Sequence, residues 1–99
     1  ELTYTARVLS GTEAAQLGLV TRLADDPLAA ARELATEIAA KSPHAVRAAK
    51  RLYDESWTAT TEETLALEAA LQLTLVGSPN QLAAVSAGLS NEPPRFVDP

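Results

Sequence analysis

The sequence predicts an all-α protein, a small bundle of about four to five helices. Three observations predict it. Helix-start signals recur along the chain, apolar residues follow at helical spacing, and glycine or paired prolines stand where each apolar pattern stops. The 99 residues suit one small domain with a modest core.

The first helix is predicted between Ser10 and Gly18. Ser10 and Glu13 match the S-x-x-E capping box, in which each side chain satisfies a backbone N–H that the first helical turn leaves unpaired. Gly18 can adopt the left-handed conformation that ends a helix. The apolar and β-branched residues 19–22 suit a short extended segment after it.

Each of the next two helices begins at a capping residue followed by proline. Asp26-Pro27 supplies an N-cap and a proline at the first helical position, and apolar residues then repeat up to about Lys41. Ser42-Pro43 repeats this signal. The helix that follows carries an apolar stripe opposite a charged face. The stripe is Ala45, Val46, Ala49, Leu52, Tyr53 and Trp57, and the charged face is Arg47, Lys50, Arg51 and Asp54.

The last two helices are equally punctuated. Thr60 and Glu63 form a capping box before a leucine-rich helix that is apolar on more than one side and ends at Gly77. Ser78-Pro79 begins the final helix, with Gln81 placed to complete its capping box. Because proline cannot continue a helix, this one stops before residues 92–94, and the tail 95–99 is predicted to be extended.

The order of these signals resembles the C-terminal third of the crotonase superfamily, the enoyl-CoA hydratases and isomerases. Residues 1–7 and 20–23 resemble the family on either side of the first capping box, residues 40–51 resemble its second helix, and residues 93–96 resemble its terminal tail. The resemblance covers essentially all 99 residues. It implies that residues 1–25 are the end of the core-domain region, with a short helix and linker, and that 26–99 form the C-terminal helical assembly domain. The resemblance further implies that the family's spiral α/β core is absent from these residues.

The resemblance also implies a function. The parent protein would be a hydratase-type lyase or an isomerase that acts on acyl-CoA thioesters in fatty-acid metabolism. The family's oxyanion-hole loops and its two catalytic glutamates lie upstream of Glu1, so this chain is expected to hold no catalytic residue and to mediate assembly of a trimer or hexamer. Coenzyme A thioester is the parent's substrate, and no cofactor is expected on this chain alone. A chain without methionine that begins with glutamate is expected to be a fragment.

Three positions are implied to lie near coenzyme A. The family's last helix contacts the coenzyme through an aromatic residue and, three positions later, a lysine. Gly88 and Asn91 occupy those positions here, which removes a stacking surface and a cation and weakens the customary contact. Phe96 in the terminal tail is the third coenzyme-proximal position.

Composition excludes other classes of ligand. A net charge of −5 and a pI near 4.7 disfavour nucleic acid and anionic membranes as partners. No apolar run approaches the roughly 20 residues that span a bilayer. The absence of cysteine fits a reducing cytoplasm, the expected location. No His/Cys set has metal-ligand spacing, so no metal site is expected.

The remaining polar residues have ordinary interpretations. His44 is predicted to face solvent, without a role, because no partner for catalysis or metal binding is near it in sequence. Lys50 and Arg51 are four residues from Asp54 and Glu55, as on a solvated helix face. A contact of this basic face with a coenzyme phosphate is the alternative.

The leucine-rich helix, with Tyr53 and Trp57, carries more apolar surface than a small bundle can hide. This predicts an interface, most simply between copies of the chain; the alternative is a tight core in which these residues face one another. Two other hypotheses for the whole chain stay open. It can be part of a complete enzyme whose N-terminal part supplies the catalytic groups, or a stand-alone helical protein-interaction module with no coenzyme A chemistry.

Overall fold

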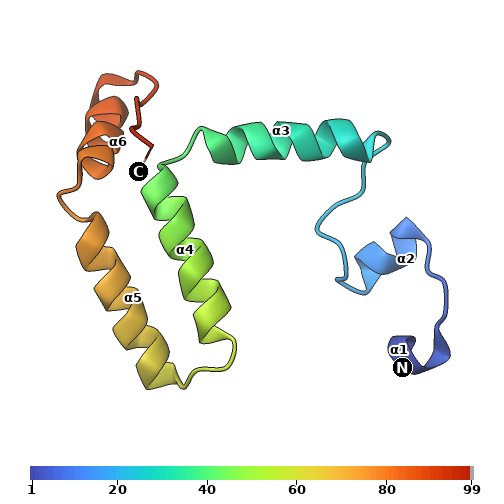
Figure 1. Ribbon diagram of the computed structural model, residues 1–99. Coiled ribbons are helices and arrows are strands. Elements are labelled where there is room, and N and C mark those ends of the chain that lie inside the picture. Colours follow the sequence, from blue (N-terminus) through green and yellow to red (C-terminus); the bar gives the residue numbers. More distant parts are fainter. Residues whose placement is uncertain (99) are drawn as a thin grey trace. The chain divides into compact units, whose positions relative to one another are not determined.

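A computed structural model describes residues 1–98, and this part of the chain is helical with no strand (Figure 1). The all-helical fold class without an α/β core is therefore confirmed. The six helices are α1 (Leu2–Thr5), α2 (Gly11–Gln16), α3 (Pro27–Ala39), α4 (Pro43–Ser56), α5 (Thr61–Leu75) and α6 (Pro79–Ser90). Five of them match the predicted helices, and the single-turn α1 was not predicted.

The chain forms two compact units, Glu1–Ala35 and Thr36–Pro99, and the boundary between them falls within α3. The first unit holds α1, α2 and most of α3. The second unit holds α4, α5, α6 and the C-terminal tail. The predicted division after residue 25 refers to the domains of a longer protein and stays a prediction.

The start of α2 differs from the predicted capping box. The Ser10 hydroxyl accepts a hydrogen bond from the Glu13 N–H at 3.2 Å, which is half of the box. The Glu13 carboxylate, however, accepts from the Arg7 guanidinium instead of reaching back to the N–H of Ser10. The predicted bond from the Ser10 N–H to the Glu13 carboxylate is therefore wrong. Its physical reason is that a charged guanidinium bonds a carboxylate more strongly than a neutral backbone N–H does. Gly18, at φ +73°, takes the predicted left-handed conformation.

The segment after α2 is a bend and an irregular loop, not the extended segment predicted for residues 19–22. A strand needs a neighbouring strand to pair its backbone groups, and residues 1–98 offer none. Arg22 anchors the loop instead, since its guanidinium donates to the carbonyl of Ala30 on α3 at 2.9 Å. At the start of α3 the Asp26 carboxylate accepts from the N–H of Ala29 at 3.0 Å, as expected for an N-cap.

In the second unit, α4 and α5 form an antiparallel pair (Figure 1). Each starts at its predicted cap. Ser42 accepts from the N–H of Ala45, while Thr60 and Glu63 complete both halves of the capping box. Gly77 follows α5 and takes the left-handed conformation, at φ +77°, that is predicted for the end of this helix.

The amphipathic pattern of α5 explains how this pair packs. Successive helical residues are rotated by about 100°, which places Leu67, Leu71 and Leu75 on one side of α5 and Leu65, Leu73 and Val76 on the other. Leu71 and Leu75 of the first side lie against α4, beside Ala45, Ala48, Ala49 and Leu52. Leu71, at 9% exposure, is the one buried hydrophobic side chain among the described residues.

The other apolar sides of both helices are open to solvent. On α5 the exposed outer face consists of Leu65, Leu73 and Val76. On α4 a strip of three exposed side chains lies beside the part that packs on α5: Val46, Tyr53 and Trp57. Leu73 is 77% exposed and Trp57 is 89% exposed. The alternative of a tight core in which these residues face one another is wrong.

The capping box of α5 makes the start of this helix sensitive to acid. The Thr60 backbone N–H and then its hydroxyl donate to the Glu63 carboxylate at 2.8 Å, and these bonds lower the pKa of Glu63. A carboxyl whose pKa is lower in the folded state stabilises the fold above its unfolded pKa of about 4.5. That stability is lost as pH falls through the folded value. We therefore expect amide exchange in the first turn of α5 to speed up when the pH falls below the pKa of Glu63 in the folded chain.

The matched variants are Glu63→Gln and Glu62→Gln. Both remove one exposed charge from the same turn, but only Glu63 belongs to the capping box. Glu63→Gln should abolish the acid-dependent part of the amide exchange, and Glu62→Gln should keep it. Equal acid dependence in the two variants would show that the box does not set the stability of this turn.

Candidate ligand-binding groove

The chain turns back on itself after α6 and encloses a groove of about 630 Å³ within the second unit. Asn91 is the reason for the turn. It adopts a left-handed conformation at φ +57°, and the N–H groups of Asn91 and Glu92 both donate to the carbonyl of Ala87. Pro93 and Pro94 then prevent further helix. The tail that follows faces the linker between α3 and α4 across the groove.

Three chain segments line the groove. The linker before α4 contributes residues 40–42, α6 contributes its last turns, and the tail contributes the third wall. The lining residues are Ala40, Lys41, Ser42, Ala84, Ala87, Gly88, Asn91, Glu92, Pro93, Pro94 and Phe96. The groove is mostly apolar, with one cation and one anion at its edge.

The structure brings the three predicted coenzyme-proximal residues together. Gly88, Asn91 and Phe96 all line this one groove. A Cβ at Gly88 would meet no atom within 4 Å, so that wall is open where the resemblance implies an aromatic ring. The half-buried ring of Phe96 is the aromatic surface that the groove does contain. Whether a ligand binds to these residues stays a prediction.

Lys41 is a groove residue that the sequence did not single out. Its ammonium lies 3.9 Å from the Glu37 carboxylate, and both side chains are largely exposed. Such a surface pair contributes little and is readily exchanged for another partner. Lys41 can therefore offer its charge to an anionic group in the groove.

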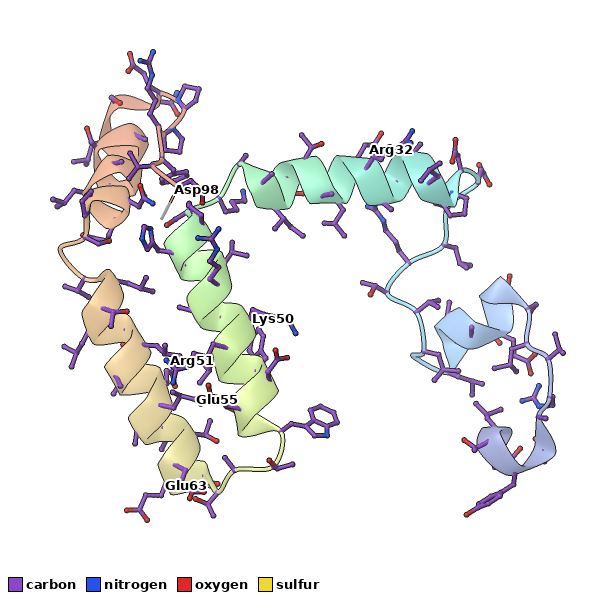
Figure 2. The ribbon with its side chains drawn as sticks, in the orientation of Figure 1. Arg32, Lys50, Arg51, Glu55, Glu63 and Asp98 are labelled. Carbon is purple, nitrogen blue, oxygen red and sulfur yellow. The ribbon has the colours of Figure 1, made fainter. Side chains whose placement is uncertain are left out.

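Asn80 fixes the tail behind the groove. Its side chain is 1% exposed, and it donates through Nδ2 to the carbonyl of Val97 at 2.8 Å while Oδ1 accepts from the Val97 N–H at 2.9 Å. Nδ2 also lies 2.7 Å from Nδ1 of His44. The Arg47 guanidinium donates to the Asp98 carboxylate at 3.0 Å, and Figure 2 shows Asp98 beside the start of α4.

His44 is therefore not the solvent-facing residue that was predicted. It is half-buried and bonded to Asn80, which lies 36 residues further along the chain. The prediction failed because it considered only sequence neighbours. Asn80 itself carried no signal beyond its place in the first turn of α6, where an exposed polar residue is ordinary.

The basic face of α4 is as predicted for a solvated surface. Lys50 pairs with Asp54 at 2.6 Å. Arg51 pairs with Glu55 at 2.7 Å, and both are labelled on α4 in Figure 2. The hydrogen bond and charge of Glu55 raise the pKa of Arg51 further above neutrality. These four residues lie outside the groove.

Gln81 reaches the N–H of Gly77 at 3.2 Å instead of that of Ser78, so the last capping box is also only half formed. In residues 1–98 no three His, Cys, Asp or Glu side chains gather as metal ligands do. No helix in the same range has the length and apolar character needed to cross a membrane.

No protein-family model matches the chain, and no curated protein matches it. A solved structure does: a protein from Mycobacterium abscessus described as a putative enoyl-CoA hydratase/isomerase, 32% identical, superimposes with a TM-score of 0.82. The match covers 90% of this chain but 38% of that protein. The resemblance of this chain to the crotonase superfamily, the enoyl-CoA hydratases and isomerases, is thereby confirmed for its helical region.

Proposed function

We propose that this chain is the C-terminal helical part of an enoyl-CoA hydratase/isomerase-family protein that acts on acyl-CoA thioesters in fatty-acid metabolism. In this proposal the helices assemble the protein into a homo-oligomer, a trimer or hexamer, and the catalytic residues lie elsewhere. The observation that carries it is the match to a solved hydratase/isomerase over 90% of this chain and 38% of that one. A cytoplasmic location belongs to the same proposal and is supported by the absence of cysteine.

Assembly is supported by the exposed apolar surface of the second unit. The outer face of α5 and the strip on α4 together leave six large apolar or aromatic side chains in water: Val46, Tyr53, Trp57, Leu65, Leu73 and Val76. Scattered apolar residues are ordinary on a surface, but neighbouring ones on a pair of packed helices are typical of an interface. Burying such side chains in a partner stabilises association by about 1.5–3 kcal/mol each.

The groove is proposed to lie beside the coenzyme moiety of the substrate. Gly88 and Asn91 lack the ring and the charge that the family resemblance leads one to expect there. Phe96 and Lys41 line the same groove and can replace them, the first by stacking on the adenine and the second by pairing with a phosphate. The groove thus retains both chemical features, supplied from different segments of the chain.

A titration of the chain with coenzyme A tests this part of the proposal. We expect the NMR signals of Gly88, Asn91 and Phe96 to shift together, and binding to weaken as salt concentration rises. Phe96→Ala should weaken binding several-fold through the lost ring contact. Lys41→Ala should reduce the salt dependence, whereas Lys50→Ala, which removes an equal charge outside the groove, should not. Shifts that avoid the groove, or none at all, would contradict the assignment.

The stand-alone interaction module remains the second candidate, because the same exposed apolar faces would suit a different protein partner. The two candidates differ in their response to coenzyme A. A module without coenzyme A chemistry should bind no coenzyme A at the groove, and Phe96→Ala should then leave its properties unchanged.

A further inference from the structure

We propose that Asn80 is a positioning residue which clasps the C-terminal tail and so builds one wall of the groove, with His44 holding the Asn80 amide in its working orientation. The identity of the groove's ligand rests on the proposed function. The clasp itself rests on the contacts of Asn80, His44 and Val97 in the second unit.

The first step is the use of the Asn80 amide. Oδ1 and Nδ2 bond the N–H and the carbonyl of the same residue, Val97, at 2.9 and 2.8 Å. This is the pairing that one strand residue gives another, here supplied by a side chain. At 1% exposure the amide is shielded from water, so loss of either bond leaves a polar group unsatisfied.

The second step is the role of His44. Because the N–H of Val97 needs an acceptor, Oδ1 of Asn80 must face it, and Nδ2 must face Val97 O and His44 Nδ1. Each of the two hydrogens on Nδ2 then has one acceptor. Nδ1 of His44 therefore accepts, and the ring carries its proton on Nε2. A flipped Asn80 amide would lose both bonds to Val97, and His44 opposes that flip.

The third step connects the clasp to the groove. Phe96, the residue before Val97, lines the groove, while Asp98, the residue after it, pairs with Arg47 at 3.0 Å. The Arg47–Asp98 pair is exposed on both sides and holds the tail weakly. The two backbone bonds to buried Asn80 consequently fix where Phe96 lies, although Asn80 does not line the groove.

Release of the tail by trypsin measures the clasp directly. We expect the bond after Arg95 to be cut when the tail leaves Asn80, so release of the peptide that starts at Phe96 should report the detached population when detachment is rapid. In Asn80→Ala, which removes both bonds, we expect release about tenfold faster than in the parent chain. Leu89→Ala, at an 86% exposed position on the same helix, is the control and should leave the rate unchanged.

A pair of variants at His44 provides a test that leaves Asn80 in place. His44→Asn keeps an oxygen acceptor at the δ1 position, and His44→Leu removes it. We expect faster tail release in His44→Leu and near-parental release in His44→Asn, with unchanged helical circular dichroism in both. If Asn80→Ala fails to fold, this pair decides the matter, and equal release from the two variants would overturn the role of His44.

The wall is tested by the NMR signals of Phe96 and Gly88 without any ligand. In Asn80→Ala these signals should move toward the values in a chain cut after Arg95. Coenzyme A should also bind more weakly, in proportion to the fraction of chains whose tail is detached. If the tail is released faster but these signals stay unchanged, the tail is not a wall and the inference is wrong. If the unsubstituted chain fails to bind coenzyme A, the proposed ligand is wrong. The rate of tail release still tests whether Asn80 holds the tail.

Discussion

Replacing Leu71 with alanine is expected to lower the free energy of unfolding of the second unit by about 2–3 kcal/mol. Leu71 is the one buried hydrophobic side chain in the described part of the chain and fills the contact between α4 and α5. Its truncation removes buried apolar surface and leaves a cavity that two helices can close only partly. Small domains are marginally stable, so this loss is a large share of the total.

The matched control for this variant is Leu89→Ala. Leu89 is 86% exposed on α6, so the same chemical change should alter the free energy of unfolding by no more than about 0.5 kcal/mol. Urea unfolding followed by circular dichroism, at a concentration low enough to suppress assembly, compares the two. Equal destabilisation would mean that the α4–α5 contact is not the core of this unit.

Replacing Leu73 with glutamate is expected to weaken assembly at least tenfold while leaving the isolated chain folded. The side chain is 77% exposed, so the monomer loses no core contact. In an oligomer that buries the outer face of α5, the change removes about 1.5–3 kcal/mol of apolar burial per copy and adds an unpaired charge. Sedimentation equilibrium of the variant beside the parent chain measures the difference.

Leu89→Glu separates this effect from a general effect of charge. It adds the same negative charge at a position as exposed as Leu73, but away from the outer face of α5 and the strip on α4. Assembly of Leu89→Glu should equal that of the parent chain. Assembly that survives Leu73→Glu would place the interface on another surface.

The helix starts were predictable because they depend on residues close in sequence. Ser42-Pro43, Thr60 with Glu63, and Ser78-Pro79 all cap helices as predicted, since a cap involves a side chain and an N–H three residues away. Predictions failed where a side chain had a choice of partner. Glu13 pairs with Arg7, a charged partner outside the local pattern, and thereby leaves its capping box half formed.

The candidate site was predicted only in part. Gly88, Asn91 and Phe96 came from the family resemblance, and the structure places them around one groove. Neither the clasp nor Lys41 could be found in this way. Asn80 bonds Val97 and His44 across 17 and 36 residues, and such contacts exist only once the helices have turned back on one another.

The sequence predicted that α5 exposes apolar side chains, but not which side of the helix they occupy. Its leucines repeat on two opposite sides, which the sequence shows as a helix apolar on more than one side. Which side meets α4 is decided by the small residues of α4, Ala45, Ala48 and Ala49, because these allow close approach. The other side is exposed.

The central claim is that these helices assemble copies of the chain. Sedimentation equilibrium of the unsubstituted 99-residue chain over a wide range of concentrations tests it most directly. The account predicts a mass that rises with concentration from that of the 10.4 kDa chain toward three or six copies. A mass that stays at 10.4 kDa at every concentration would contradict it and favour a helical module whose partner is a different protein.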